Sequence, residues 1–363
     1  MVKPDRTGGY RMVRVTYSGK MQIGGSGIGS TAMHQVKPLY TNKMLGKIYA
    51  SDLKPPSDAS LLHLFFNQIP DIQHPTYFVG DVIFDTITSL MMEKPTILQS
   101  WLNHAHAQMI QHPDAIKIIN LFSAHPDIQA KLVGIPDNLE SQLSLQRQRA
   151  ELEMADYILI PSQFVLKTLE EKGLGDKAIV MPFGVDLEKF TPADKTDDKF
   201  RVIFVGSNWI RKGGPLLLEA WDKLNLDNSE LIICGISKEE SQDMDIKDNV
   251  KVGWVPDLVK SLQNSSVFCL PALEDGCPLA THEAMACGLP AIVTENTGTK
   301  DYITHGEDGF IIKPNDVDSI CEVLEHLHGQ NLTKMGKRAR KTIEKWPWER
   351  YERHYIDFIR RLE

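Results

Sequence analysis

The sequence predicts an α/β protein with two domains, each built on a parallel sheet. At 363 residues the chain suits two domains of ordinary size, each able to bury its own core. Its second half alternates short, nearly continuous apolar runs with helical patterns, which is typical of strands covered on both faces. In such sheets ligands bind at the carboxyl ends of the strands, so the residues that follow each strand are the first candidates for a site.

The first half shows this alternation less regularly. A helix predicted over residues 142–154 leads into the last of its strands. Gly, Pro and charged residues gather at residues 184–192 and mark the domain boundary. The strands predicted in this half cover residues 11–17, 61–66, 76–84, 96–100, 115–122 and 156–161.

The second half is more regular. Pro215 suits the first turn of a helix, and Gly288 suits the position just after a helix end. The predicted strands cover residues 202–205, 230–234, 250–253, 267–270, 291–294 and 310–312. Helices are predicted over residues 214–224, 257–264, 279–286 and 348–362, the last of them amphipathic.

The composition, 42% hydrophobic and 24% charged, is that of a soluble globular protein. No apolar run approaches the roughly 18 to 20 residues that span a bilayer, and the N-terminus lacks the apolar core of a secretory signal. The five cysteines form no C-x-x-C pair, which favours buried free thiols and no zinc site. A cytoplasmic location is therefore expected.

The net charge of −8 is unevenly distributed, because residues 1–47 carry eight basic side chains and one acid, Asp5. This excess either faces an anionic acceptor or a lipid headgroup surface, with peripheral membrane contact, or is a set of solvated lysines around a loop. Aromatic residues do not interleave with these charges, so nothing indicates nucleic-acid recognition.

The most informative segment is Pro271-Ala-Leu-Glu-Asp-Gly-Cys-Pro-Leu-Ala-Thr-His-Glu-Ala-Met-Ala-Cys-Gly-Leu-Pro290. It places Asp275 and Glu283 eight positions apart, around a small-residue turn between a strand and a helix start. Free N–H groups and the positive end of a helix dipole favour an anionic or hydroxyl-rich ligand there. We interpret both carboxylates as acceptors for ligand hydroxyls; the alternative is two solvated acids.

A second segment, Gly206-Ser-Asn-Trp-Ile-Arg-Lys-Gly-Gly214, also follows a strand and leads into a helix. Arg211 and Lys212 lie in this loop, where a diphosphate would meet two cations and backbone amides. Both segments follow strand ends, so the predicted fold brings them to one crevice.

These segments resemble the donor-site signature of the family-4 retaining glycosyltransferases, which have two Rossmann-like domains in the GT-B arrangement. The resemblance implies that Glu283 binds the nucleotide ribose, that Asp275 contacts the donor sugar, and that Arg211 and Lys212 hold the donor phosphates. The family's first carboxylate is a Glu, and with Glu274 beside Asp275 either residue could take that role. Further donor contacts are implied for Gly206, Ser207, Val255, Gly276, Cys277, Pro278 and Leu279.

The resemblance covers most of the chain outside residues 24–72. It implies an acceptor-side domain over residues 1–185, a donor domain over 186–345 and a helix over 346–363 that returns to the first domain. Other matching segments are residues 180–192, 252–257, 291–298, 308–314 and 346–351.

In the first domain the family has a Gly-rich loop where this chain has Gly24-Gly-Ser-Gly-Ile-Gly29, so Gly27 and Gly29 are candidates, or an ordinary flexible loop. His125 follows a predicted strand and either faces the donor sugar, as the resemblance implies, or is a loop or capping histidine. Asn103 or His104 could touch an acceptor, or be polar residues at a helix start. The triplet Asp243-Met-Asp245 lies in a polar stretch and is interpreted as solvated surface.

The resulting hypothesis is a retaining glycosyltransferase that moves a hexose-type sugar from a UDP- or GDP-sugar to an unidentified acceptor, which could be a glycan, a lipid-linked molecule or a small molecule. No cofactor and no metal are expected. Two alternatives stay open: a sugar-nucleotide epimerase of the same fold, and a non-catalytic binding subunit.

Overall fold

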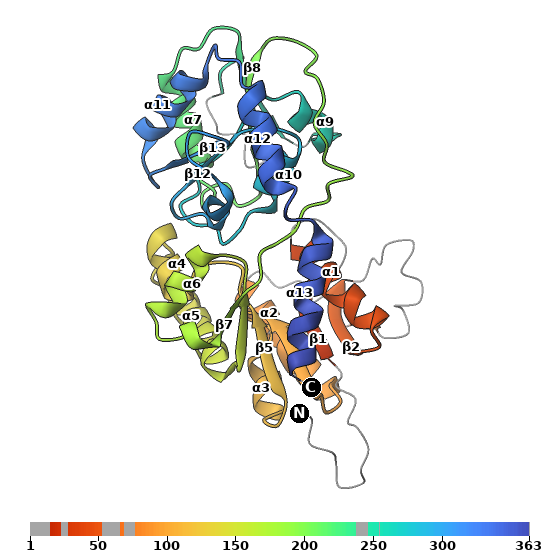
Figure 1. Ribbon diagram of the computed structural model, residues 1–363. Coiled ribbons are helices and arrows are strands. Elements are labelled where there is room, and N and C mark those ends of the chain that lie inside the picture. The colour runs from red at the N-terminus through yellow and green to blue at the C-terminus, as the bar shows by residue number, and fades with distance from the viewer. Residues whose placement is uncertain are drawn as a thin grey trace.

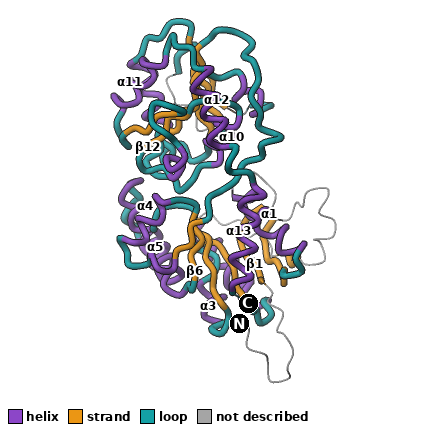
Figure 2. The backbone as a smooth tube through the Cα atoms, in the orientation of Figure 1, coloured by secondary structure: helices purple, strands orange, loops and turns teal. Residues whose placement is uncertain are grey.

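The computed structural model describes residues 15–22, 28–52, 66–68, 77–236, 246–253 and 255–362. Figures 1 and 2 show two α/β domains, one above the other, with the chain passing between them twice. Each domain has a parallel sheet with helices around it, so the predicted fold class is confirmed.

The first sheet has seven parallel strands in the order β3-β2-β1-β4-β5-β6-β7. The strands are β1 Val15–Gln22, β2 Leu45–Asp52, β3 Phe66–Gln68, β4 Ile97–Trp101, β5 Ile116–Asn120, β6 Tyr157–Ile160 and β7 Ala178–Val180. The helices are α1 Ile28–Thr41, α2 Tyr77–Met91, α3 His106–Gln111, α4 Pro126–Val133, α5 Leu139–Met154 and α6 Gln163–Glu170.

The second sheet has six parallel strands in the order β10-β9-β8-β11-β12-β13. The strands are β8 Phe200–Val205, β9 Ser229–Cys234, β10 Val250–Gly253, β11 Val267–Leu270, β12 Ala291–Thr294 and β13 Gly309–Ile312. The helices in this half of the sequence are α7 Gly214–Lys223, α9 Leu258–Gln263, α10 Leu279–Ala286, α11 Val317–Leu327, α12 Thr333–Ile343 and α13 Trp348–Arg361. Strand order reverses between β8 and β11, which is where sheets of this kind bind ligands.

All six strands predicted for the second half are confirmed, with ends that differ by at most two residues. The predictions for the first half of the chain are less accurate. The strand predicted over residues 76–84 is wrong, because Tyr77–Met91 is helix α2. Its apolar run carries no period that separates a buried strand from a buried helix. Strands β2 and β7 were not predicted, and residues 11–14 and 61–65 lie outside the described residues.

Helix α13 belongs to the first domain, although it follows the second in sequence (Figure 1). The ring of Trp348 stacks on His34 of α1 with ring centroids 4.1 Å apart, and Tyr351 Oη accepts a hydrogen bond of 2.8 Å from Gln35. The two crossings between the domains lie side by side, since the Val185 N–H donates to the Trp346 carbonyl. The returning helix is therefore confirmed.

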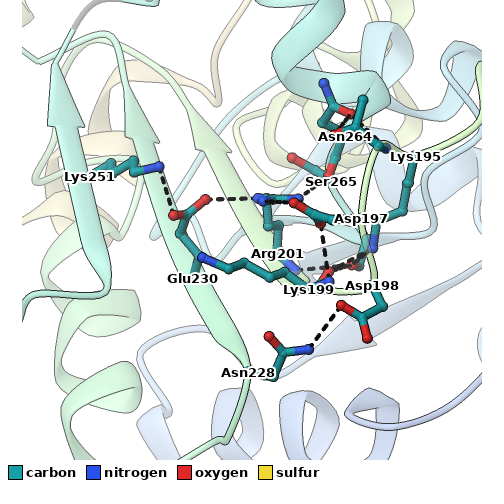
Figure 3. Close-up of polar contacts among 12 residues, drawn as sticks. Lys195, Asp197, Asp198, Lys199, Arg201, Asn228, Glu230, Lys251, Asn264 and Ser265 are labelled. Atoms are coloured by element: carbon teal, nitrogen blue, oxygen red, sulfur yellow. Dashed lines mark hydrogen bonds and ion pairs between the residues drawn. The ribbon is translucent and has the colours of Figure 1, made fainter.

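A cluster of charges ties the incoming linker to the amino-terminal edge of the second sheet (Figure 3). Arg201 donates to both carboxylate oxygens of Asp197 at 2.6 Å and to Glu230 at 2.8 Å. Lys251 also pairs with Glu230, at 2.7 Å. These side chains satisfy one another at the edge opposite to the carboxyl ends of the strands, so their role is to anchor the linker.

Candidate active site

The loop after β8 brings two cations to the carboxyl end of the second sheet. Gly206 leaves room for the aliphatic part of Lys212, because a Cβ there would lie 2.3 Å from Lys212 Cδ. Gly213, with φ at 73°, approaches so closely that a Cβ would lie 1.9 Å from the Pro271 carbonyl oxygen. This close approach lets the loop lie against the segment that follows β11. Ser207 is exposed at the start of the loop.

Asp275 lies where the two loops meet. Lys212 Nζ is 2.6 Å and Arg211 Nη2 is 3.4 Å from Asp275 Oδ2. Burial raises the pKa of this carboxyl, but Lys212 and Arg211 outweigh it and hold the pKa below its ordinary value. Asp275 is therefore a buried carboxylate between two cations. The loops that follow β8 and β11 lie against each other, as the predicted parallel sheet requires.

Glu274 has different partners, although it is adjacent in sequence. Its carboxylate accepts from the Ala124 N–H at 2.7 Å and from Gln129 Nε2 at 2.8 Å, both in the first domain. Arg211 Nη1 completes the set at 3.2 Å. Glu274 thus joins the two domains, and Asp275 is the carboxylate that contacts Lys212.

Glu283 lies one turn into α10, half-buried. Burial raises its pKa to about 7, with Asp186 adding to the shift and Lys189 opposing it. The turn before α10 holds Gly276, Cys277 and Pro278, and Leu279 is the first helical residue. Gly288 follows the helix with φ at 82°, as predicted.

The domains touch directly at Gly276. A Cβ there would lie 2.1 Å from the Phe122 carbonyl oxygen of the first domain. Ser162 Oγ donates to the Gly276 carbonyl at 2.8 Å, and the Gln163 N–H donates to Asp301 at 2.7 Å. The contacts of Ser162, Gln163 and Gln129 were not predicted. Only the pattern of Ser162 at the start of a helix was available in the sequence, and it indicates a cap rather than an interdomain contact.

His125 lies at the N-terminus of α4. The ring Nδ1 accepts a hydrogen bond from the Asp127 backbone N–H at 3.2 Å. The backbone N–H of His125 donates to Thr168 Oγ1 at 2.9 Å. The residue is 3% exposed, and burial lowers the pKa of the ring to about 4. The ring caps the N-terminus of α4, which agrees with the interpretation of His125 as a capping histidine. Contact of this ring with a donor sugar stays a prediction.

The remaining candidates are described in part. Gly29 belongs to the first turn of α1, and Val255 is half-buried beyond β10. Gly27, Asp243 and Asp245 lie outside the described residues. The cysteines are free thiols, four of them buried.

A family model described as "Glycosyl transferases group 1" matches residues 186–346. That range contains Arg211, Lys212, Asp275 and Glu283. Residues 186–346 belong to the group 1 glycosyltransferases.

Proteins similar to this chain include an Escherichia coli UDP-Gal:alpha-D-GlcNAc-diphosphoundecaprenol alpha-1,3-galactosyltransferase, 34% identical over 192 residues. A Corynebacterium glutamicum GDP-mannose-dependent mannosyltransferase, acting on a monoacylated phosphatidylinositol monomannoside, is 28% identical over 241 residues. These matches cover 46% and 58% of this chain. The chain spans about half the length of the first relative (49%) and 62% of the second.

Solved structures extend the comparison to the whole fold. Sucrose-phosphate synthase from Thermosynechococcus elongatus superposes with a TM-score of 0.78 at 16% identity, covering 96% of this chain and 99% of its own. Anabaena HepE in complex with UDP has a TM-score of 0.67 at 13% identity, with 96% and 99% covered. The group 1 domain is thus one half of a GT-B fold.

Proposed function

We propose that this protein is a retaining glycosyltransferase that uses a nucleoside-diphosphate sugar. The observation that carries the proposal is the meeting of Arg211, Lys212 and Asp275 at the point where the strand order of the second sheet reverses. The names of the relatives add support, since they specify UDP-galactose and GDP-mannose as donors and UDP as a bound ligand.

The two cations suit a diphosphate leaving group. Lys212 has three N–H donors and Arg211 has five, more than their contacts with Asp275 and Glu274 use. In the proposed reaction the bond between the sugar's anomeric carbon and the phosphate oxygen breaks, and a bond to the acceptor oxygen forms on the same face. The acceptor proton passes to the departing phosphate, and a nucleoside diphosphate leaves. Fixed cations stabilise the charge that develops on this group.

The direct test is an assay of the purified chain with UDP- and GDP-sugars, with the products followed by nuclear magnetic resonance. We expect nucleoside diphosphate to be released, and the sugar to keep its anomeric configuration in the product. Appearance of an epimeric sugar nucleotide, without nucleoside diphosphate, would instead support an epimerase. Nucleotide binding without any turnover would support a binding subunit.

Replacement of Glu283 tests the ribose contact. We expect Glu283→Gln to weaken nucleotide binding about tenfold, since hydrogen bonds to charged groups are worth about 1.5–3 kcal/mol and a neutral amide accepts more weakly. Because burial raises the pKa of Glu283 to about 7, the native affinity should rise with pH through that value as the carboxylate forms. Calorimetry between pH 6 and 8 checks both effects. The variant should show no rise with pH; equal affinities in a folded variant would remove Glu283 from the site.

A further prediction concerns whether the reaction needs a metal ion. Asp243 and Asp245 lie outside the described residues, and elsewhere no group of three or more His, Cys, Asp or Glu side chains is placed to hold an ion. Arg211, Lys212 and the start of α10 supply positive potential without an ion. We therefore expect initial rates to persist in excess EDTA. Loss of activity with full rescue by magnesium or manganese would contradict this.

None of the described helices is long and apolar enough to cross a bilayer. Most of residues 1–27 lie outside the described part, so membrane contact through the basic N-terminal 47 residues stays a prediction.

A further inference from the structure

Helix α6 of the first domain begins at a contact with the second domain. Figure 1 shows α6 beside α4, at the end of the first domain that faces the second. Ser162, the residue before this helix, is 2% exposed, and its Oγ donates to the Gly276 carbonyl at 2.8 Å. The same oxygen accepts from the Val165 N–H at 3.3 Å and so caps α6. One hydroxyl therefore closes the first turn of α6 and also contacts the turn that carries Asp275.

The contact reaches the Asp275 carboxylate through a single peptide group. The Gly276 carbonyl, which accepts from Ser162, and the Cys277 N–H belong to the same peptide. Burial raises the pKa of the Asp275 carboxyl, and two cations and the Cys277 N–H together hold it below its ordinary value. Because a peptide group is planar and a hydrogen bond to its carbonyl polarises its N–H, the Ser162 hydroxyl both orients and strengthens this donor to Asp275.

The opposite side of the turn is held by residues 296–298. The Asp275 N–H donates to the Asn296 carbonyl at 3.1 Å, and the Gly298 N–H donates to the Asp275 carbonyl at 2.9 Å. A Cβ on Gly298 would lie 1.7 Å from the Gly276 carbonyl oxygen and 2.4 Å from Ser162 Oγ. The turn is therefore packed between two segments, and Ser162 is the contact that comes from the first domain.

Asp301 contacts the same helix end from the second domain. Its carboxylate accepts at 2.7 Å from the N–H of Gln163, the first residue of α6. The neighbouring Lys300 places its Nζ over the ring of Phe164, 5.5 Å from the centroid. A carboxylate is favoured at a helix N-terminus by the helix dipole. The start of α6 is thus capped twice, by its own Ser162 and by an acid of the other domain.

We infer that Ser162 is a positioning residue for sugar transfer, which together with Asp301 holds the start of α6 against the Gly276 peptide and so orients the Asp275 carboxylate. The inference rests on the proposed transfer reaction. It gives Ser162 an action through the peptide and not on the substrate itself. The two cations and the ribose acid that are proposed to bind the nucleotide belong to the second domain. Loss of the Ser162 contact should therefore lower turnover without weakening nucleotide binding.

The first test removes the hydroxyl at little cost to the helix. Glycine is an acceptable N-cap, so α6 can still form in Ser162→Gly. Asn138→Gly is the matched control, because Asn138 caps α5 of the same domain through the Ser141 N–H at 2.9 Å and is exposed. We measure kcat and KM with the sugar nucleotide that the native enzyme uses fastest. Calorimetry gives the dissociation constant and stoichiometry of the matching nucleoside diphosphate.

Ser162→Gly should lower kcat roughly tenfold, because the buried Gly276 carbonyl loses its donor, while KM and the nucleotide dissociation constant stay within about twofold of native. The stoichiometry counts folded donor domains, so a fall in kcat per bound nucleotide does not come from unfolded enzyme. Asn138→Gly should match the native enzyme throughout. Native kcat in Ser162→Gly, an equal fall in Asn138→Gly, or a stoichiometry that falls in proportion to kcat would overturn the inference.

The second test asks whether Ser162 and Asp301 act at one place. Asp301→Ala should lower kcat about three- to tenfold, whereas Asp316→Ala, which removes the cap of α11 within the second domain, should leave it native. If the two residues hold the same contact, the double variant should lose clearly less than the product of the single losses. Losses that multiply would show independent effects and contradict a shared role.

Donor hydrolysis and transfer by the native enzyme separate the two hypotheses. Absence of both refutes the proposed function and this inference with it. Native turnover that Ser162→Gly leaves unchanged refutes only the inference.

Discussion

Lys212→Ala should lower the rate of sugar transfer or donor hydrolysis by roughly 10²- to 10³-fold, the usual cost of removing one electrostatic group that stabilises transition-state charge. Lys212 Nζ lies 2.6 Å from Asp275 and the side chain is 13% exposed, so its charge is held at the site. Removal of Lys212 leaves the buried Asp275 with Arg211 alone at 3.4 Å, so the free energy of unfolding should fall as well, and the rates are compared at a temperature at which the variant is folded. Initial rates and thermal unfolding of the same preparation measure the two effects.

Lys223→Ala is the matched control. This lysine is the last residue of α7, the helix that follows the Lys212 loop. Its side chain is half-exposed and forms ion pairs with Glu219 and Asp318. Exposed pairs contribute about 0–1 kcal/mol, so its removal should leave both rate and stability near native values. Native turnover in Lys212→Ala would show that the Arg211–Lys212 pair is only a solvated loop.

Gly276→Ala should reduce turnover by about 10²-fold or more through the arrangement of the domains. The added Cβ would lie 2.1 Å from the Phe122 carbonyl oxygen, and neither backbone can yield without parting the two loops. A misplacement of about 1 Å can cost that much in rate. Nucleotide binding within the second domain should persist, and small-angle scattering should show a larger radius of gyration.

Gly134→Ala controls for the ordinary effect of replacing a glycine. Gly134 ends α4 with φ at 74°, and a Cβ there would meet nothing within 4 Å, so only backbone strain is added. A modest loss of stability with native turnover is expected. If Gly276→Ala keeps native turnover, the contact with Phe122 is not part of the active arrangement.

The sequence was most informative where a local motif determines the structure. Arg211, Lys212 and Asp275 each follow a short apolar strand in a regular βαβ pattern, so their meeting at one edge followed from topology. The roles of Glu274 and Asp275 could not be separated in this way. Their difference depends on Ala124 and Gln129, about 150 residues earlier in the chain, and no local pattern records that contact.

Other features depend on packing alone. The run that forms α2 reads equally as a buried strand, and its helical state places Asp85 where it accepts from the Ala107 and Gln108 N–H groups. Asn103 was a candidate acceptor contact from its place after a strand, but the burial of its side-chain oxygen, which has no hydrogen-bond partner among the described residues, depends on Glu151 and Arg147 holding the backbone. Burial of that kind leaves no periodic signal in the sequence.

The return of α13 to the first domain has a consequence for protein engineering. A chimaera that borrows a donor domain from a relative cannot be spliced once, near residue 185, because the borrowed tail would then have to fit Gln35, His34 and Gln99 of the recipient. Two junctions are needed, one before β8 and one between Ile343 and Trp348, so that each recipient keeps its own terminal helix. The exchangeable cassette is an internal insert, and its two ends lie close together beside Val185 and Pro347.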